Sequence, residues 1–187
     1  MTQLPGAARA ETGGRDMTAH HLILVRHAQA AHELFGSQDR ERPLTAQGEL
    51  DAQTLGEKLA GVGIDFSSAN LWHSTARRTT QTTQAIACHL PQSCIVHGLD
   101  ALYDLDLYGI LELVRETPRT VRTLVIIGHN PAIAETCRHL ASDAIDGPIA
   151  RELMKGYEPG TAALFTVVSD WAGLSPNTAT LGTVLHP

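Results

Sequence analysis

Short runs of aliphatic and β-branched residues alternate along this chain with longer segments of helical periodicity, and this alternation restricts the folds open to it. The run His21–His27 is too short for a buried helix and does not alternate with outward polar residues, so we expect a central strand there. Five more runs of similar length are predicted strands: Asn70–His73, Cys94–His97, Thr123–Ile127, Ala162–Val168 and Thr178–Leu185.

Helical periodicity fills the segments between these runs. Thr45 is suited to cap a helix that ends near Ala60, because glycines follow there. The other predicted helices are Ala76–Leu90, Asp106–Glu116 and one that begins near Pro131. Strands that alternate with helices of this length indicate βαβ units. The sequence therefore predicts the α/β class, as a single three-layer α/β/α domain with a mainly parallel central sheet and helices on both faces.

Three of the predicted strands end at residues suited to phosphate chemistry. The first ends at Arg26 and His27, the second leads through Ser74 to Arg78, and the fourth ends just before His129. Ligands of such sheets bind at the carboxyl ends of the strands. A guanidinium matches phosphate oxygens with two parallel hydrogen bonds, and a neutral imidazole is a nucleophile near pH 7. We therefore expect a phosphoryl site at this edge of the sheet.

Charge and hydropathy exclude two classes of partner. The chain has 14 Lys and Arg against 20 Asp and Glu, a net charge of −6, and no block of basic residues. Nucleic-acid binding requires clustered cations, so no nucleic-acid partner is expected. Apolar stretches such as Leu22–Val25 and Leu124–Ile127 are far too short to span a bilayer, and the lack of a basic block also argues against a membrane-surface role, so no membrane partner is expected.

The cysteines and the first residues indicate where the protein resides. Three cysteines without a CxxC pair, Cys88, Cys94 and Cys137, do not form a disulfide framework of their own, so reduced thiols are expected. Residues Met1–Ala19 lack the apolar core of a signal peptide. We expect a flexible leader over 1–19, with Met17 as an alternative start, and a cytoplasmic protein.

Four motifs, in order, carry a family resemblance. They are Leu24-Val25-Arg26-His27-Ala28, Arg42-Pro43-Leu44-Thr45 with Gly48, Ser74 to Thr82, and Gly128-His129-Asn130-Pro131. Together they resemble the histidine phosphatase superfamily, and within it the short bacterial phosphohistidine phosphatases of the SixA type. The resemblance implies a phosphoglycerate mutase-like fold and a histidine phosphatase domain over 20–187.

The resemblance also implies a role for each motif residue. By position, His27 accepts the phosphoryl group, and Arg26 binds its oxygens. The family arginine lies four residues after the motif serine, which selects Arg78, and Arg77 is expected to be exposed or paired with an acid. His129 completes the pocket by donating a hydrogen bond to the phosphoryl oxygens, and Asn130 is a further candidate for contact with the ligand.

The proton donor is where this chain departs from the family. Larger members carry a glutamate in a segment between the second arginine and the second histidine, and no such segment is visible here. Asp100 follows the predicted third strand, where relatives of this branch often have an acid, so it is the first candidate. Asp104 and Asp106 are the alternatives. A solvated carboxylate remains the other interpretation of each.

No cofactor is expected. The chain has ten histidines, but they lack HExxH or Cys/His ligand spacing, so no metal site is predicted. A GxxxxGK phosphate loop is also missing from the sequence.

The predicted function is that of a cofactor-independent phosphatase. His27 attacks phosphorus, and water then hydrolyses the phosphohistidine enzyme and releases inorganic phosphate. The expected substrate is phosphohistidine on a partner protein. A small phosphorylated substrate is the alternative, and a mutase is disfavoured because little chain is left for inserted segments. A non-catalytic phosphate-binding module of the same fold is the hypothesis from another class.

Overall fold

The computed structural model describes residues 19–32, 38–142 and 147–187. The predicted flexible leader over 1–19, with Met17, lies outside this part of the chain except for its last residue. No helix within the described ranges is both long and apolar enough to cross a membrane.

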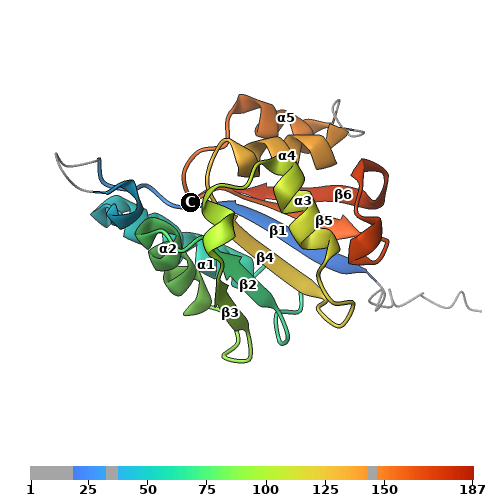
Figure 1. Ribbon diagram of the computed structural model, residues 1–187, viewed down its shortest axis with the longest axis horizontal. Coiled ribbons are helices and arrows are strands. Elements are labelled where there is room, and N and C mark those ends of the chain that lie inside the picture. The colour runs from blue at the N-terminus through green and yellow to red at the C-terminus, as the bar shows by residue number, and fades with distance from the viewer. Residues whose placement is uncertain (1–18, 33–37, 143–146) are drawn as a thin grey trace, which may run out of the picture.

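A six-stranded sheet forms the centre of the molecule (Figure 1). Its strands are β1 (His20–Arg26), β2 (Asn70–His73), β3 (Ile95–Gly98), β4 (Thr123–Gly128), β5 (Ala162–Val167) and β6 (Ala179–Leu185). Their order across the sheet is β3-β2-β4-β1-β5-β6. The pairs β1–β4, β2–β4 and β2–β3 are parallel, whereas β5 is antiparallel to both of its neighbours. The mainly parallel sheet is confirmed, and each predicted strand is present within one residue at either end.

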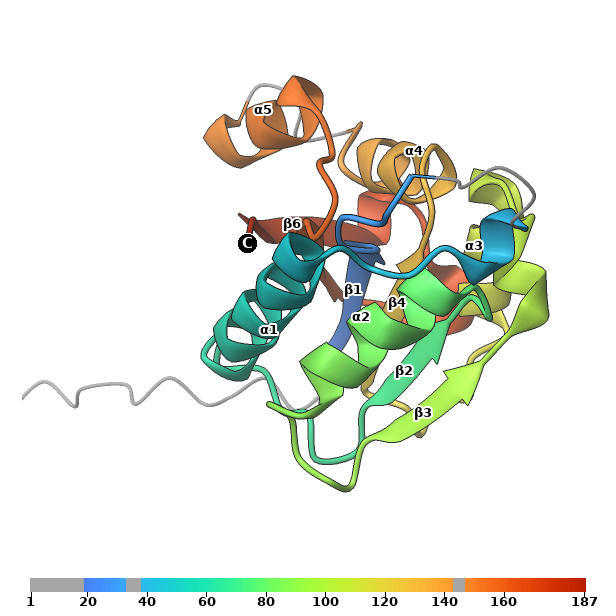
Figure 2. The same cartoon turned by 90° about the vertical axis from the view of Figure 1, so that its left-hand side faces the viewer.

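Helices cover both faces of this sheet, which confirms the three-layer prediction. They are α1 (Ala46–Ala60), α2 (Arg77–Ala87), α3 (Leu107–Arg115), α4 (Ala132–Leu140) and α5 (Pro148–Lys155). Figure 2 shows α1 and α2 side by side on one face, and Figure 1 shows α3 and α4 over the other. The helix α5, which packs against α4 and β6, is an addition to the predicted set.

Capping residues account for where two of the helices begin. The Thr45 side chain accepts a hydrogen bond from the Gly48 amide at 3.0 Å, and the Asp106 side chain accepts one from the Gly109 amide at 2.9 Å. Each bond satisfies an amide that has no partner within its own helix. The predicted start of α1 is thereby confirmed.

Side chains along β1 alternate between the two faces of the sheet, so this strand packs against both helical layers. Leu22 and Leu24 pack into the core beneath α3 and α4, while Ile23 and Val25 pack into the core beneath α1 and α2. All four are fully buried, and burial of each aliphatic side chain contributes about 1.5–3 kcal/mol. β1 is thus held from both faces, which fixes the position of the residues at its end.

Parallel register brings three strand ends to one edge. Arg26 of β1 lies opposite Gly128 of β4, and His73 of β2 lies opposite Ile127 of β4. Hydrogen bonding between the two segments continues past the end of β1, where the His27 amide donates to the Gly128 carbonyl at 3.0 Å. The residues that follow β1, β2 and β4 therefore meet at this edge.

Candidate active site

His27 follows β1 directly, and its ring is held in one orientation. Its Nδ1 lies 2.8 Å from the Ala28 carbonyl oxygen. A carbonyl only accepts, so Nδ1 carries the hydrogen and Nε2 keeps its lone pair. That lone pair faces the Nε–H of Arg78, which donates to it at 3.3 Å. Nε2 is thus the ring nitrogen of His27 that carries a lone pair, and it is the atom that can act as a nucleophile at this edge of the sheet.

The environment keeps this imidazole neutral. Burial is the main cause that lowers the pKa of His27 to about 4, although the hydrogen bond to Ala28 opposes the shift. The positive charges of Arg78, Arg26 and Arg42 lower the pKa of His27 further. A neutral ring is the form that attacks phosphorus.

Arg78 lies at the start of α2 and is the point where the site residues converge. Its side chain is 7% exposed. Besides its bond to His27, its Nη2 lies 3.3 Å from Nδ1 of His129. On the other side, Nη1 donates to the Asp39 carbonyl at 2.7 Å, and Nη2 donates to Asp39 Oδ2 at 2.8 Å. Arg77 is exposed, in agreement with its predicted position.

His129 follows β4 and presents its ring to the same space. Since arginine has no acceptor, Nδ1 of His129 accepts from Arg78, and Nε2 carries the hydrogen and donates to the buried Ser74 hydroxyl at 3.0 Å. Burial is the main cause that lowers the pKa of His129 to about 3, and repulsion between the two imidazoles when both are protonated, together with the charge of Arg78, lowers it further. The His27 and His129 ring centroids are 5.2 Å apart. The structure therefore brings both predicted histidines together around Arg78.

Arg26 and Asn130 reach the site from the ends of β1 and β4 and share one acceptor. Arg26 Nη1 donates to the Tyr157 carbonyl at 2.6 Å, and Asn130 Nδ2 donates to it at 3.0 Å. Among the described residues, neither Arg26 Nε nor Asn130 Oδ1 has a hydrogen-bond partner, although both atoms are buried. Burial also lowers the pKa of Arg26, against the charge of Glu158. The Nε–H of Arg26 is thus a donor, and Oδ1 of Asn130 an acceptor, that can each form a further hydrogen bond at this edge of the sheet.

The predicted proton donor lies at the rim. Asp100 belongs to a short 3-10 helix, Asp100–Tyr103, and its side chain is 71% exposed. Its carboxylate accepts from Thr75 Oγ1 at 2.6 Å and pairs with Arg40. The bond from Thr75, followed by that from Arg40, lowers the pKa of Asp100. None of the contacts found among the described residues joins Asp100 to either histidine.

Within the described ranges, the two alternative acids form no hydrogen bond or ion pair with either histidine, although both line the cavity beside His129. Asp104 is 80% exposed and 3.8 Å from Arg40. Asp106 caps α3. The proton-donor role predicted for Asp100 stays a prediction.

Three further residues support Arg78: Asp39 and Tyr103, which no sequence motif marks as site residues, and Arg42, which belongs to the second motif and reaches Arg78 through Asp39. Asp39 opens a 3-10 helix, Asp39–Glu41, and its Oδ1 accepts from Arg42 Nη1 at 2.8 Å. Its Oδ2 accepts from the Tyr103 hydroxyl at 2.6 Å. The bond from Tyr103 is the leading cause that holds the pKa of Asp39 well below its usual range. The three-residue spacing of Asp39 and Arg42 was the available signal, because it places both on one helical turn.

A cavity of about 340 Å³ adjoins His129. It is bounded by the start of α3 and the first turn of α4, and three carboxylates line it: Asp104, Asp106 and Glu135. The cavity lies beside His129, whose ring is next to that of His27, and its volume is sufficient for part of a leaving group.

Known proteins resemble this chain in sequence and in fold. The profile of the Histidine phosphatase superfamily (branch 1) matches residues 22–121, which include Arg26, His27 and Arg78. A solved structure from Nakamurella multipartitia, named as a candidate phosphohistidine phosphatase SixA, has 31% sequence identity and a TM-score of 0.78, over 90% of this chain and 96% of that one.

Two curated relatives extend the comparison. Serine/threonine-protein phosphatase PGAM5 of Rattus norvegicus is 37% identical over 76 residues, which are 41% of this chain and 25% of that protein. The chain thus aligns with about a quarter of the length of that relative. An uncharacterised protein of Mycobacterium tuberculosis is 28% identical over 163 residues, 84% of this chain and 96% of that protein.

Proposed function

The chain belongs to the histidine phosphatase superfamily, and from that premise we propose that it is a phosphatase whose preferred substrate is phosphohistidine on a partner protein. Family membership and the likeness to phosphatases support phosphatase activity. The choice of phosphohistidine follows the name of the N. multipartitia structure and the chemistry of the site.

The observation that carries the proposal is the single tautomer of His27. Its Nδ1–H is bound to Ala28, and its Nε2 lone pair lies 3.3 Å from the Arg78 Nε. In the first step Nε2 forms a bond to phosphorus as the bond to the leaving nitrogen breaks, and that nitrogen keeps the electron pair and takes up a proton from solvent. In the second step a water oxygen forms a bond to phosphorus as the Nε2–phosphorus bond breaks, which releases neutral His27 and inorganic phosphate, and the water proton stays on the phosphate or passes to solvent.

The cationic side chains supply the electrostatic part of catalysis. Charge on the transferring phosphoryl group is spread over its oxygens, and donors that are already in place stabilise it without reorganisation. Arg78 faces His27 directly, and the buried Nε of Arg26 has no partner among the described residues. Both are suited to bind phosphoryl oxygens. His129 joins them once it takes a proton, which the negative phosphoryl group favours.

The acid–base properties of the site favour a nitrogen leaving group. Asp39 and Asp100 both have a lowered pKa, so both carboxylates are ionised at neutral pH and hold no proton to donate. Expulsion of an alkoxide needs a strong general acid, whereas the nitrogen of a phosphoramidate takes up a proton more readily. This difference supports phosphohistidine over an alkyl phosphate. The scheme uses no metal or organic cofactor.

A second candidate substrate is a phosphoester of serine or threonine on a protein. The name of the PGAM5 relative favours it, over the part of that protein that aligns. We place the reaction in the cytoplasm, where the exposed Cys88 and the buried Cys137 remain reduced.

A substrate comparison tests the proposal. We would measure kcat/KM for a small protein phosphorylated on histidine, for a phosphothreonine peptide and for para-nitrophenyl phosphate. The proposal predicts that the first is preferred over the phosphothreonine peptide by at least about 100-fold, the size of a positioned proton-transfer contribution, whereas para-nitrophenolate leaves without protonation and reports phosphatase activity as such. Equal or better turnover of the phosphothreonine peptide would transfer the assignment to that ester. Phosphate binding without turnover of any substrate would indicate a non-catalytic module.

A further inference from the structure

We propose that Asp39 is a positioning residue, which fixes the guanidinium of Arg78 in the orientation that phosphoryl transfer requires. The inference rests on the function proposed above, because it assigns Asp39 a role only through Arg78.

The two edges of the Arg78 guanidinium have different partners. Nη1 and Nη2 form one edge, and they donate to the backbone carbonyl of Asp39 at 2.7 Å and to its Oδ2 at 2.8 Å. Nε and Nη2 form the other edge, and they face His27 Nε2 and His129 Nδ1, each at 3.3 Å. A guanidinium is planar, so two bonds on one edge determine the direction of the other. Asp39 therefore orients the edge that faces the nucleophile.

Asp39 is itself held in place. Its Oδ1 accepts from Arg42 Nη1 at 2.8 Å, and Arg42 Nε is bound in turn to the Ala31 carbonyl at 2.7 Å. Its Oδ2 accepts from the Tyr103 hydroxyl at 2.6 Å. Asp39 is thus anchored independently of Arg78, as a residue that positions another must be.

Contacts beside Asp39 anchor the same turn of chain. Arg40 lies over the Tyr103 ring, 4.1 Å from its centroid, and pairs with Asp100. The helix Asp39–Glu41 is therefore tied to the helix Asp100–Tyr103, and a segment 60 residues away in sequence supports the position of the Asp39 carboxylate.

The consequence for catalysis follows from the geometry of two-point binding. An arginine that presents two N–H groups to a phosphoryl group forms a bidentate contact, which depends strongly on angle. With the carboxylate removed, the buried Arg78 keeps its charge but loses one of the two bonds that set its angle. The phosphoryl group then meets a cation that is present but not aligned, and misalignment reduces the rate of transfer.

A double-mutant cycle tests whether Asp39 acts through Arg78. Asp39→Asn removes the charge and keeps the size, and Arg78→Lys keeps the charge and removes the planar fork. With para-nitrophenyl phosphate, we expect kcat/KM to fall about 10–100-fold in Asp39→Asn and about 100–1,000-fold in Arg78→Lys. The double variant should lie within about threefold of Arg78→Lys, because the fork that Asp39 orients is already gone. Losses that multiply would overturn the proposal.

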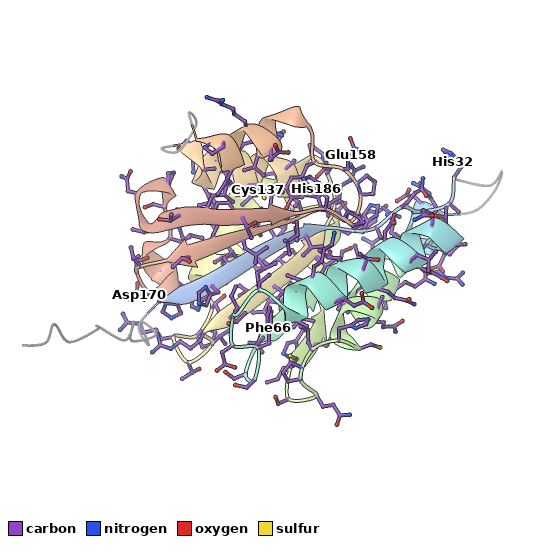
Figure 3. The ribbon with its side chains drawn as sticks, turned by 180° about the vertical axis from the view of Figure 1, so that it is seen from behind. His32, Phe66, Cys137, Glu158, Asp170 and His186 are labelled. Carbon is purple, nitrogen blue, oxygen red and sulfur yellow. The ribbon has the colours of Figure 1, made fainter. Side chains whose placement is uncertain are left out.

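The control and the fallback use other residues of the chain. Asp170→Asn also breaks an acid–arginine pair, with Arg119. Figure 3 shows Asp170 at the opposite end of the sheet from Glu158, whose charge acts on Arg26 of the site. This control should keep the wild-type kcat/KM. If Asp39→Asn does not fold, Tyr103→Phe removes one bond to the carboxylate. It should lower kcat/KM about 3–10-fold in the wild type and leave Arg78→Lys unchanged.

A spectroscopic measurement separates this inference from the proposed function. In wild-type protein, slow rotation about the Cζ–Nη bonds should give resolved Nη–H NMR signals for Arg78, assigned by their loss in Arg78→Lys. The signals should merge in Asp39→Asn. A wild type that turns over no phosphorylated substrate would refute the proposed function and leave this NMR test valid. Unchanged Arg78 signals in a folded Asp39→Asn protein would refute the positioning role alone.

Discussion

Arg78 donates a hydrogen bond from Nε to Nε2 of His27 over 3.3 Å, and this contact joins the proposed nucleophile to its electrostatic partner. His27 comes from the end of β1 and Arg78 from the first turn of α2, 51 residues later. The register of β1 in the sheet and the start of α2 determine this contact. Either side chain can therefore be replaced without a change to the buried core.

Replacement of the nucleophile gives the first prediction. His27→Asn should lower kcat/KM on a phosphohistidine protein by at least about 10⁴-fold, the scale found when a covalent nucleophile is removed. The fold should persist, because β1 is held by its buried residues Leu22–Val25. Circular dichroism checks the fold, and stopped-flow phosphate release measures the rate. A folded variant within about tenfold of wild type would refute the assignment of His27.

The two neighbouring arginines give the second prediction. Arg78→Ala should cost about 2–4 kcal/mol of transition-state stabilisation, since a buried charge-assisted contact is lost. Arg77→Ala, the matched control, should change kcat/KM less than about threefold, because Arg77 is exposed. Steady-state kinetics of both variants decides between them. Similar losses would place the phosphate ligand at Arg77.

Titration of the histidines gives the third prediction. With its pKa lowered to about 4, chiefly by burial, His27 should remain neutral as the pH falls from 7 to about 5. Imidazole ¹⁵N chemical shifts, assigned with His27→Asn, measure this directly. A His27 midpoint near the ordinary value of about 6.5 would show that the ring is solvated.

The same shift predicts how stability depends on pH. The unfolded chain binds a proton at His27 below about pH 6.5, whereas the folded protein binds it only below about pH 4. The unfolded state therefore holds more protons in this window, and the free energy of unfolding falls as the pH is lowered through it. Urea unfolding at several pH values measures the slope, which should be smaller in His27→Asn. Equal slopes would contradict the burial of His27.

The proton donor gives the fifth prediction. If Asp100 protonates the leaving group, Asp100→Asn should slow an alkyl phosphate by about 10²–10⁴-fold and a phosphohistidine protein much less. Four kcat/KM values, for wild type and variant on both substrates, test it. Small and equal effects would instead fit an exposed carboxylate that is bound to Thr75 and Arg40.

Local patterns explain which parts of the structure are predictable. The strands and most helices follow from runs of apolar residues and from caps such as Thr45 and Asp106. His27 and His129 could be brought together from sequence because each follows a strand, and parallel strands end at one edge. For these two histidines, the order of strands and helices along the sequence was sufficient to predict that they lie close together.

Long-range contacts explain what could not be predicted. Asp39 approaches Arg78 from 39 residues away, and Tyr103 approaches Asp39 from 64 residues away. Neither residue lies at a strand end, and the three-residue spacing of Asp39 and Arg42 does not show which distant residues they contact. The helix α5 begins at Pro148, just after residues outside the described ranges, and it has only eight residues. Such a short helix depends on its packing against α4 and β6.

The central claim is that the phosphoryl group passes through His27, and a rapid-quench experiment tests it most directly. Wild-type protein is mixed with a phosphohistidine protein labelled with ³²P, quenched within one turnover, and digested to locate the label. The proposed mechanism predicts label on the peptide that contains His27, lost in acid, stable in alkali and missing from His27→Asn. An acid-stable label on the peptide that contains Ser74, or turnover without any labelled enzyme, would contradict it.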